Sequence, residues 1–110
     1  IIAFSDQNYL DANPDPALRV YFDSEVPDMR TRSELQREIA AAGFHTIAQR
    51  VLPNASWEAY YTPQAQRITM LRAAADAALT QVLDEAESEI AMWRRYSDQF
   101  GYVLSVVRPT

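Results

Sequence analysis

Two kinds of apolar spacing alternate along the chain. Residues 1–4 form a short, wholly apolar run, which is typical of a strand buried on both faces. Residues 44–52 are rich in Ile, Val, Thr and Phe, and residues 102–108 repeat the pattern after a break at Gly101. These runs predict three strands. Residues 7–13 are polar and predict a loop.

Helical signals lie between the first two predicted strands. Asp15 followed by a proline is a helix start, and it predicts a short helix that ends near residues 25–27. Thr31 and Glu34 fit a capping box, in which hydroxyl and carboxylate satisfy backbone N–H groups reciprocally. We expect a helix over residues 34–42, stopped by Gly43.

The segment before the last strand is helical by the same criteria. Residues 56–61 predict a turn or a single helical turn, and Thr62 with the next proline predicts a new helix start. That helix would bury Ala65, Ile68, Leu71 and Ala75. Asp76 would cap the longest helix, whose apolar stripe consists of Leu79, Val82, Leu83, Ala86, Ile90 and Trp93.

The order of these elements predicts an α/β fold. Strands that alternate with helices imply a three-stranded mixed sheet flanked by helices, with the first two strands parallel through a right-handed crossover. A length of 110 residues suits a single domain over residues 1–110. A sheet of three strands leaves at least one edge exposed or paired with something outside the chain.

Composition excludes several chemistries. The chain has no cysteine, no lysine, one histidine (His45) and two glycines (Gly43 and Gly101). Thiolate and Schiff-base chemistry, cysteine-ligated zinc and glycine-rich phosphate loops are therefore excluded, and no metal site is expected. The net charge of -5 with scattered arginines argues against a nucleic-acid partner. No run approaches the ~20 apolar residues of a membrane span, and the start has no signal-peptide pattern, so we expect a cytoplasmic protein without a membrane partner.

Six short segments together resemble a known family. Residues 1–6, 26–29, 41–44, 52–63, 100–103 and 107–109 are similar, in this order and spacing, to the C-terminal part of bacterial class I S-adenosylmethionine-dependent methyltransferases. The resemblance implies that residues 1–5, 44–52 and 102–108 are the fifth, sixth and seventh strands of that fold, with the seventh antiparallel between the other two. Residues 56–99 would be a helical insertion on the methyl-acceptor side.

The resemblance also implies what the chain does not contain. In that family, the glycine-rich cofactor loop and the acidic residue that holds the cofactor lie upstream of the matched part. We therefore expect the chain alone to bind no cofactor, S-adenosylmethionine included, and to have no catalytic residue. It is either a natural stand-alone protein or a piece of a longer enzyme.

Six residues are candidates for binding a substrate. Trp57, Tyr60 and Tyr61 could form an apolar acceptor pocket with the carboxylate of Glu58, or the aromatic turn could simply fill a gap in the core. Asp6 follows the first predicted strand and would stand at its carboxyl end, where α/β sheets place ligands, or would cap the loop that holds Tyr9. His45 starts the second strand, so we interpret it as structural or exposed.

Two functions follow as hypotheses. The first is a methyltransferase-like module on the acceptor-substrate side of the fold, inactive without a cofactor-binding half. The second is a non-catalytic binding or assembly protein that associates through its exposed sheet edge or face. A homodimer is the expected assembly, and a small molecule is the other candidate partner.

Overall fold

The computed structural model describes all residues, 1–110. Contacts divide the chain into two compact units, one of residues 1–52 and 98–110 and one of residues 53–97. The sheet unit, as we call the first, contains β1 (Ile2–Tyr9), α1 (Pro16–Glu25), α2 (Arg32–Ala41), β2 (Phe44–Val51) and β3 (Phe100–Pro109). The second, the hairpin unit, contains α3 (Asn54–Arg72) and α4 (Ala77–Tyr96). The expectation of a single domain over residues 1–110 stays a prediction.

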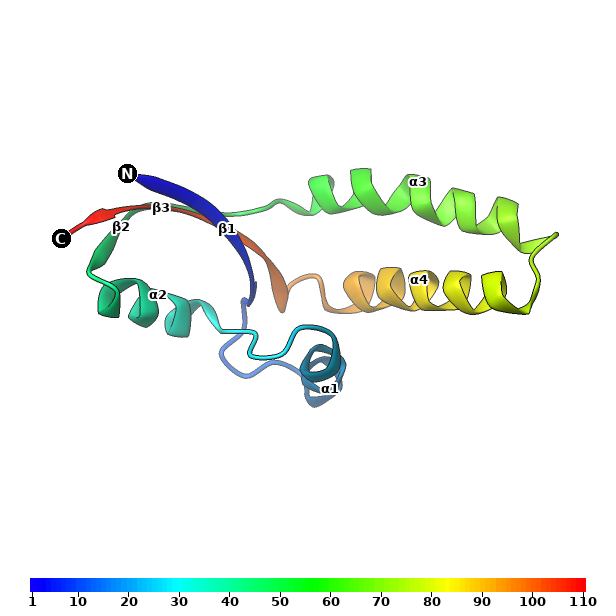
Figure 1. Cartoon of the computed structure of the whole chain (residues 1–110), viewed down its shortest axis with the longest axis horizontal. Coiled ribbons are helices and arrows are strands. Elements are labelled where there is room, and N and C mark those ends of the chain that lie inside the picture. The colour runs from blue at the N-terminus through cyan, green and yellow to red at the C-terminus, as the bar shows by residue number, and fades with distance from the viewer. The chain divides into compact units, whose positions relative to one another are not determined.

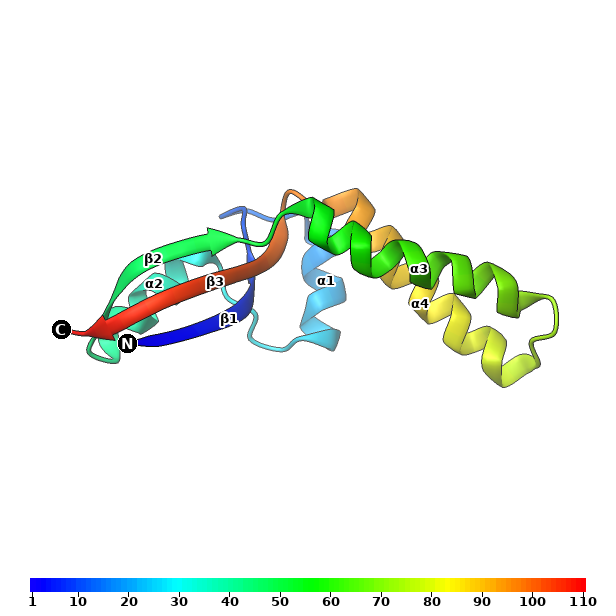
Figure 2. The ribbon, with the colours of Figure 1, turned by 90° about the horizontal axis from the view of Figure 1, so that it is seen from above.

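The sheet has the order β1-β3-β2, and β3 is antiparallel to both neighbours (Figure 2). β1 and β2 therefore run in the same direction, as the sequence predicted, but they do not pair with each other. The α/β class with three strands and flanking helices is confirmed. Both hydrogen-bonded pairs are antiparallel, so the sheet is antiparallel and the predicted mixed sheet is wrong in this respect.

α2 packs on one face of the sheet (Figure 1). Its Leu35 and Ile39 form a buried cluster with Val103 and Val107 of β3. The helix begins as predicted, because Thr31 Oγ1 accepts the Glu34 N–H at 3.2 Å, although the Glu34 carboxylate bonds to the Thr31 hydroxyl at 3.1 Å. Gly43, with φ of +87°, provides the left-handed turn into β2.

β1 differs from its prediction in length and in burial. The strand continues through the polar residues Gln7 and Asn8 to Tyr9, which pairs with Phe100 of β3. The predicted loop at residues 7–9 is therefore wrong, as is burial of the strand on both faces, since Ile1 and Ile2 are 83% and 49% exposed. The antiparallel register with β3 outweighs the polar composition, because it pairs every residue of β1.

The other two strands lie close to their predicted ranges. β2 carries a bulge between Thr46 and Ala48, and His45 is exposed, as interpreted from the sequence. β3 begins at Phe100, so Gly101 lies inside the strand rather than before it. α1 starts at the predicted Asp15 cap, whose carboxylate accepts the Ala17 N–H at 2.8 Å.

The first helix of the hairpin unit is continuous. α3 runs from Asn54 to Arg72 with Pro63 in its interior, so both the predicted turn at residues 56–61 and the restart at Thr62 are wrong. Trp57 and Tyr61 share one face of α3 and are buried together with Ile68. A proline removes one backbone hydrogen bond from a helix, and the packing of this face outweighs that loss.

α4 follows its predicted pattern more closely. Asp76 is the cap, with its carboxylate accepting the Leu79 N–H at 2.8 Å, and Leu83, Ile90 and Trp93 are buried. Val82 was expected in the same stripe and is instead 58% exposed. Neither α3 nor α4, nor any other helix, is both long enough and apolar enough to cross a membrane.

Ion pairs join the two helices at the end of the hairpin unit near its turn. Arg72 of α3 contacts Asp84 and Glu87 of α4, at 2.9 and 2.5 Å. Both carboxylates are 62% exposed, so these contacts add little to stability.

The buried stripe of α4 gives the first prediction. Leu83→Ala and Ile90→Ala should each lower the free energy of unfolding by about 2–4 kcal/mol, because each leaves a cavity between the helices. Val82→Ala is the matched control on an exposed turn of the same helix and should change it by less than about 0.5 kcal/mol. Urea unfolding followed by circular dichroism measures all three. Equal losses at Val82 and Ile90 would show that the buried face is assigned wrongly.

Candidate functional site

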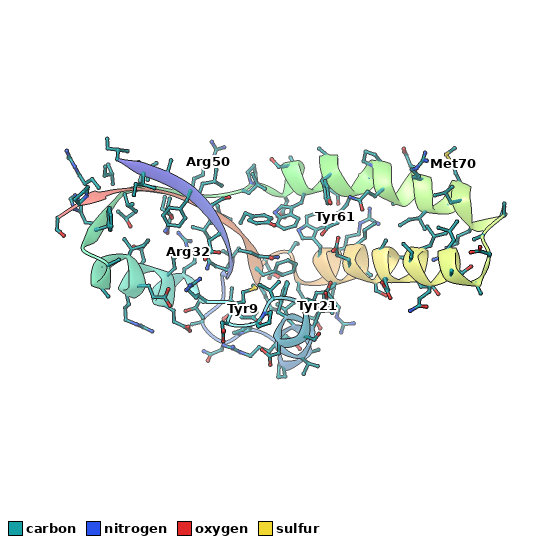
Figure 3. All side chains as sticks on the ribbon, in the orientation of Figure 1. Tyr9, Tyr21, Arg32, Arg50, Tyr61 and Met70 are labelled. Carbon is teal, nitrogen blue, oxygen red and sulfur yellow. The ribbon has the colours of Figure 1, made fainter.

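The predicted site residues fall on two elements. Asp6 and Tyr9 lie on β1 of the sheet unit, and the aromatic cluster with its carboxylate lies on α3 of the hairpin unit. Figure 3 labels one residue of each group, Tyr9 and Tyr61. Each group therefore has to be judged by its own surroundings.

Asp6 is not at the carboxyl end of its strand. It lies in the middle of β1, opposite Val103. Its carboxylate is 3.3 Å from the Arg30 guanidinium and accepts a hydrogen bond from the Asn8 amide at 3.2 Å. Arg30 also contacts Glu38 of α2. The predicted position is thus wrong, and the carboxylate takes part in a network that ties β1 to the segment before α2.

Tyr9 occupies the carboxyl end of β1 instead. Its side chain is only 1% exposed, and its ring packs edge-on against Phe22 with centroids 5.9 Å apart. The Arg19 guanidinium lies 4.9 Å from the ring centre. Burial raises the pKa of the Tyr9 phenol above its ordinary 10.0, with a smaller opposing effect of Arg19 and a further rise due to Asp23.

Two polar atoms at this strand end have no hydrogen-bond partner. They are the Tyr9 hydroxyl and the Asn8 amide oxygen, both buried. Buried polar groups are almost always paired, so the end of β1 is distinctive within the sheet unit. Sequence reasoning included Tyr9 but missed Asn8, because it placed residue 8 in a loop; the polar pair directly before the apolar Leu10 was the available signal.

The aromatic residues of α3 separate into two pairs. Trp57 and Tyr61 are buried. Trp57 stacks with Trp93 of α4 at a centroid distance of 5.9 Å, and Tyr61 packs against the same ring at a tilt, with centroids 5.5 Å apart. Tyr60 is 60% exposed. Glu58 is about half exposed and accepts a hydrogen bond from the Thr62 hydroxyl at 3.0 Å.

The buried aromatic residues therefore agree better with the interpretation that they fill a gap in the core than with the interpretation that they form an acceptor pocket. Trp57, Tyr61 and Trp93 form an aromatic core between α3 and α4, since offset stacking of this kind stabilises helix packing. Glu58 and Tyr60 are the members of the predicted set whose side chains reach the surface.

Two concave regions lie outside the predicted set. One is a groove of about 650 Å³ between α3 and α4, bordered by Ile68, Ile90 and Arg94. The other is an apolar groove of about 370 Å³ between β1 and α2, lined by Phe4, Leu35 and other apolar side chains. Sequence reasoning found neither, because each depends on how two elements pack against one another.

The glycines do not form a cradle for a nucleoside cofactor. A Cβ at Gly43 would meet nothing within 4 Å, and one at Gly101 would meet only Leu10 and Val51 of the protein itself, at 3.6 and 3.8 Å. Gly43 lies in the turn between α2 and β2 and Gly101 lies inside β3, so the two do not form one glycine-rich loop. The residues of this chain do not fit S-adenosylmethionine by that criterion, and we derive no step through it.

Comparisons with known proteins were made for the sequence and for the fold. No protein-family model matches the sequence, and no curated protein matches it. Among solved structures, the fold is similar to a SAM-dependent methyltransferase from Geobacter sulfurreducens in complex with S-adenosyl-L-homocysteine. That match has a TM-score of 0.68 and 11% identity, and it covers 98% of this chain and 45% of that chain.

Two further structures give the same result. YjhP from E. coli matches with a TM-score of 0.71 and 13% identity, over 98% of this chain and 48% of that chain. A SAM-dependent methyltransferase from Thiobacillus denitrificans, in complex with S-adenosyl-L-homocysteine, matches with a TM-score of 0.68 and 10% identity. This match covers 98% of this chain and 45% of that chain. The chain spans about half the length of these structures. It has the fold of part of a SAM-dependent methyltransferase.

The surroundings of Tyr9 give the second prediction. Tyr9→Phe should leave stability at pH 7 unchanged or higher, because the hydroxyl that it removes is buried without a partner. Since the folded phenol has the higher pKa, the unfolded chain ionises first and the native protein should lose stability as the pH rises above about 10. Tyr9→Phe should weaken that loss, and Tyr60→Phe, at an exposed site, should not.

Urea unfolding at neutral and alkaline pH tests both parts. A loss of more than about 1 kcal/mol for Tyr9→Phe at pH 7 would mean that the hydroxyl has a hydrogen-bond partner after all.

Proposed function

We propose that this chain is the acceptor-substrate side of a methyltransferase-like protein and does not transfer methyl groups by itself. The observation that carries the proposal is the fold match, which covers 98% of this chain but only 45–48% of each neighbour. A segment comparable in size to this chain thus lies outside the match. The chain has only two glycines, and they do not lie in one loop, so we propose that these 110 residues alone do not bind the cofactor.

The surface for an acceptor is proposed from side chains that remain available. Tyr60 and Glu58 are exposed on α3. Within the predicted set, these two are the residues that we propose to contact an acceptor. Tyr9 is buried in the sheet unit, and Asp6, Trp57 and Tyr61 have structural partners within their own units.

The third prediction concerns the cofactor. Calorimetric titration of the 110-residue chain with S-adenosylmethionine should give no saturable heat, because no loop in it can hold the nucleoside and the methionyl group. The coding DNA upstream, or a neighbouring gene, should encode a segment with a glycine-rich loop, and the chain joined to that segment should bind the cofactor. Saturable binding by the 110 residues alone, or none by the joined protein, would contradict the proposal.

A second candidate function is self-association through β1, and the backbone geometry of this strand favours it. The Tyr9 N–H donates to the Arg30 carbonyl on one side, and the Leu10 N–H donates to Gln99, next to β3, on the other. Backbone groups alternate along a strand. Those of Ala3, Ser5 and Gln7 therefore point away from β3, and beyond the bridge of Tyr9 to Thr31 nothing pairs with this edge.

The side chains at the start of this edge are apolar. Ile1 and Ile2 are exposed at its start, and the groove between β1 and α2 runs along it. A bare apolar edge promotes pairing with another strand. A second copy related by a two-fold axis would turn two three-stranded sheets into one of six strands, and the net charge of -5 opposes this only weakly.

The fourth prediction tests this pairing. Light scattering at tens of micromolar should give the mass of a dimer, and Ser5→Pro should convert it to a monomer, because proline removes an N–H that faces outward and leaves the bonds to β3 in place. Ser5→Thr is the matched control and should remain dimeric. A monomer mass for the unmodified protein would exclude this candidate.

A further inference from the structure

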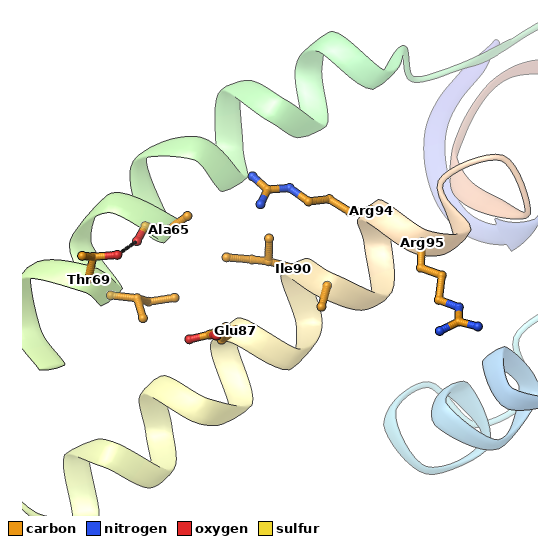
Figure 4. Close-up of a pocket in the computed structure, with 8 residues that line it drawn as sticks. Ala65, Thr69, Glu87, Ile90, Arg94 and Arg95 are labelled. Atoms are coloured by element: carbon orange, nitrogen blue, oxygen red, sulfur yellow. Dashed lines mark hydrogen bonds between the residues drawn. The ribbon is translucent and has the colours of Figure 1, made fainter.

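The groove between α3 and α4 has an apolar floor. Ile68 from α3 and Ile90 from α4 are buried at its centre, and Figure 4 shows Ile90 pointing from α4 toward α3. Ala65 and Ala91 border it from opposite helices. Their short side chains leave the space of about 650 Å³ open, a volume in the range of small-molecule sites.

Most polar groups around the groove are already paired. The Thr69 hydroxyl donates to the Ala65 carbonyl at 3.2 Å. The Glu87 carboxylate bonds to Arg72 of α3. The contact of Arg72 with Glu87 joins the two helices on the turn side of the groove and pairs the acidic side chain there, so that end offers a ligand little beyond apolar contact.

Arg94 differs from these groups. Figure 4 shows its side chain extending from α4 across the groove toward α3. Its nearest carboxylate is Glu58, at 3.8 Å, which is an ion-pair contact beyond hydrogen-bond distance. Glu58 accepts its closer bond from Thr62, at 3.0 Å. A guanidinium has five N–H donors in a planar fork that matches a carboxylate, and the donors of Arg94 remain available.

Arg95 borders the same groove but has a different orientation. Figure 4 shows its side chain directed away from α3, and its guanidinium lies 5.5 Å from the ring centre of Tyr96. Two neighbouring arginines of equal charge therefore differ in whether they reach into the groove. This difference allows a test that separates a specific contact from general attraction of an anion.

We propose that the groove between α3 and α4 binds a monocarboxylic acid with an apolar body, its carboxylate held by Arg94 and its body lying over Ile68 and Ile90. A ligand with one negative charge fits best, because one guanidinium faces the groove while Glu87 and Glu58 stand near its two ends. This inference goes beyond the proposed function. It involves no cofactor and no group transfer, so it can fail while that function holds.

The fifth prediction uses decanoate, below its micelle-forming concentration, as the probe in calorimetric titrations of the whole chain. Saturable binding to one site is expected. Arg94→Gln should weaken it about tenfold or more, since a charge-assisted hydrogen bond to the carboxylate is lost. Arg95→Gln, which removes the same charge one residue away, should change it by less than about twofold, a limit set by the screening of exposed charges.

Two further measurements keep the proposal falsifiable. Decanol, which has the same body and no charge, should bind the native chain and Arg94→Gln equally. Ala65→Phe should abolish decanoate binding by filling the groove, with circular dichroism showing that the helices remain. Equal losses for Arg94→Gln and Arg95→Gln, undiminished binding to a folded Ala65→Phe variant, or no saturable binding at all would each overturn the proposal.

Discussion

The sheet depends on the insertion of β3 between two strands that come from the N-terminal half of the sequence. β1 and β2 have no hydrogen bonds to each other, so each belongs to the sheet only through β3. Val103 is fully buried in that strand, and Ser105 and Val107 nearly so. Residues 1–52 therefore contain two strands but no sheet. Pairing β1 with β3 closes a loop of most of the chain, which slows folding, and the α3–α4 hairpin lies within that loop.

Sequence reasoning was most accurate where a local hydrogen bond decides the structure. Asp15, Thr31 and Asp76 were predicted as helix caps, and each accepts a backbone N–H two or three residues ahead. The length of β1 was not accessible in this way. Gln7 and Asn8 are polar and read as a loop, but their place is set by partners in β3 that lie more than 90 residues further along. Propensity is a weak guide when such a partner exists.

In the candidate site, too, local features were predicted from the sequence, and features that depend on distant partners were not. Aromatic residues at positions 57 and 61 were recognised as a cluster, but Pro63 was interpreted as a helix start, and the spacing of four that places Trp57 and Tyr61 on one face was missed. Trp93 lies on the other helix, where it stacks on Trp57 and contacts the ring of Tyr61. The aromatic residues that cluster in the sequence therefore lie mainly in the core between α3 and α4. The direction of the Arg94 side chain could not be predicted, because its neighbour Arg95 is the same residue type, carries the same charge and lies on the same helix.

The unpaired polar atoms of the sheet unit bear on function because they cost stability. A buried donor or acceptor without a partner is unfavourable by about 1–3 kcal/mol. Other half-buried polar side chains of this unit have partners: Arg32 bonds to Gln49, Gln49 bonds to Ser105, and the Arg30 Nε contacts the Glu38 carboxylate. The Asn8 amide oxygen and the Tyr9 hydroxyl are adjacent exceptions at the carboxyl end of one strand. Phenylalanine at position 9 would fill the same space without that cost, so packing within this unit does not explain the hydroxyl.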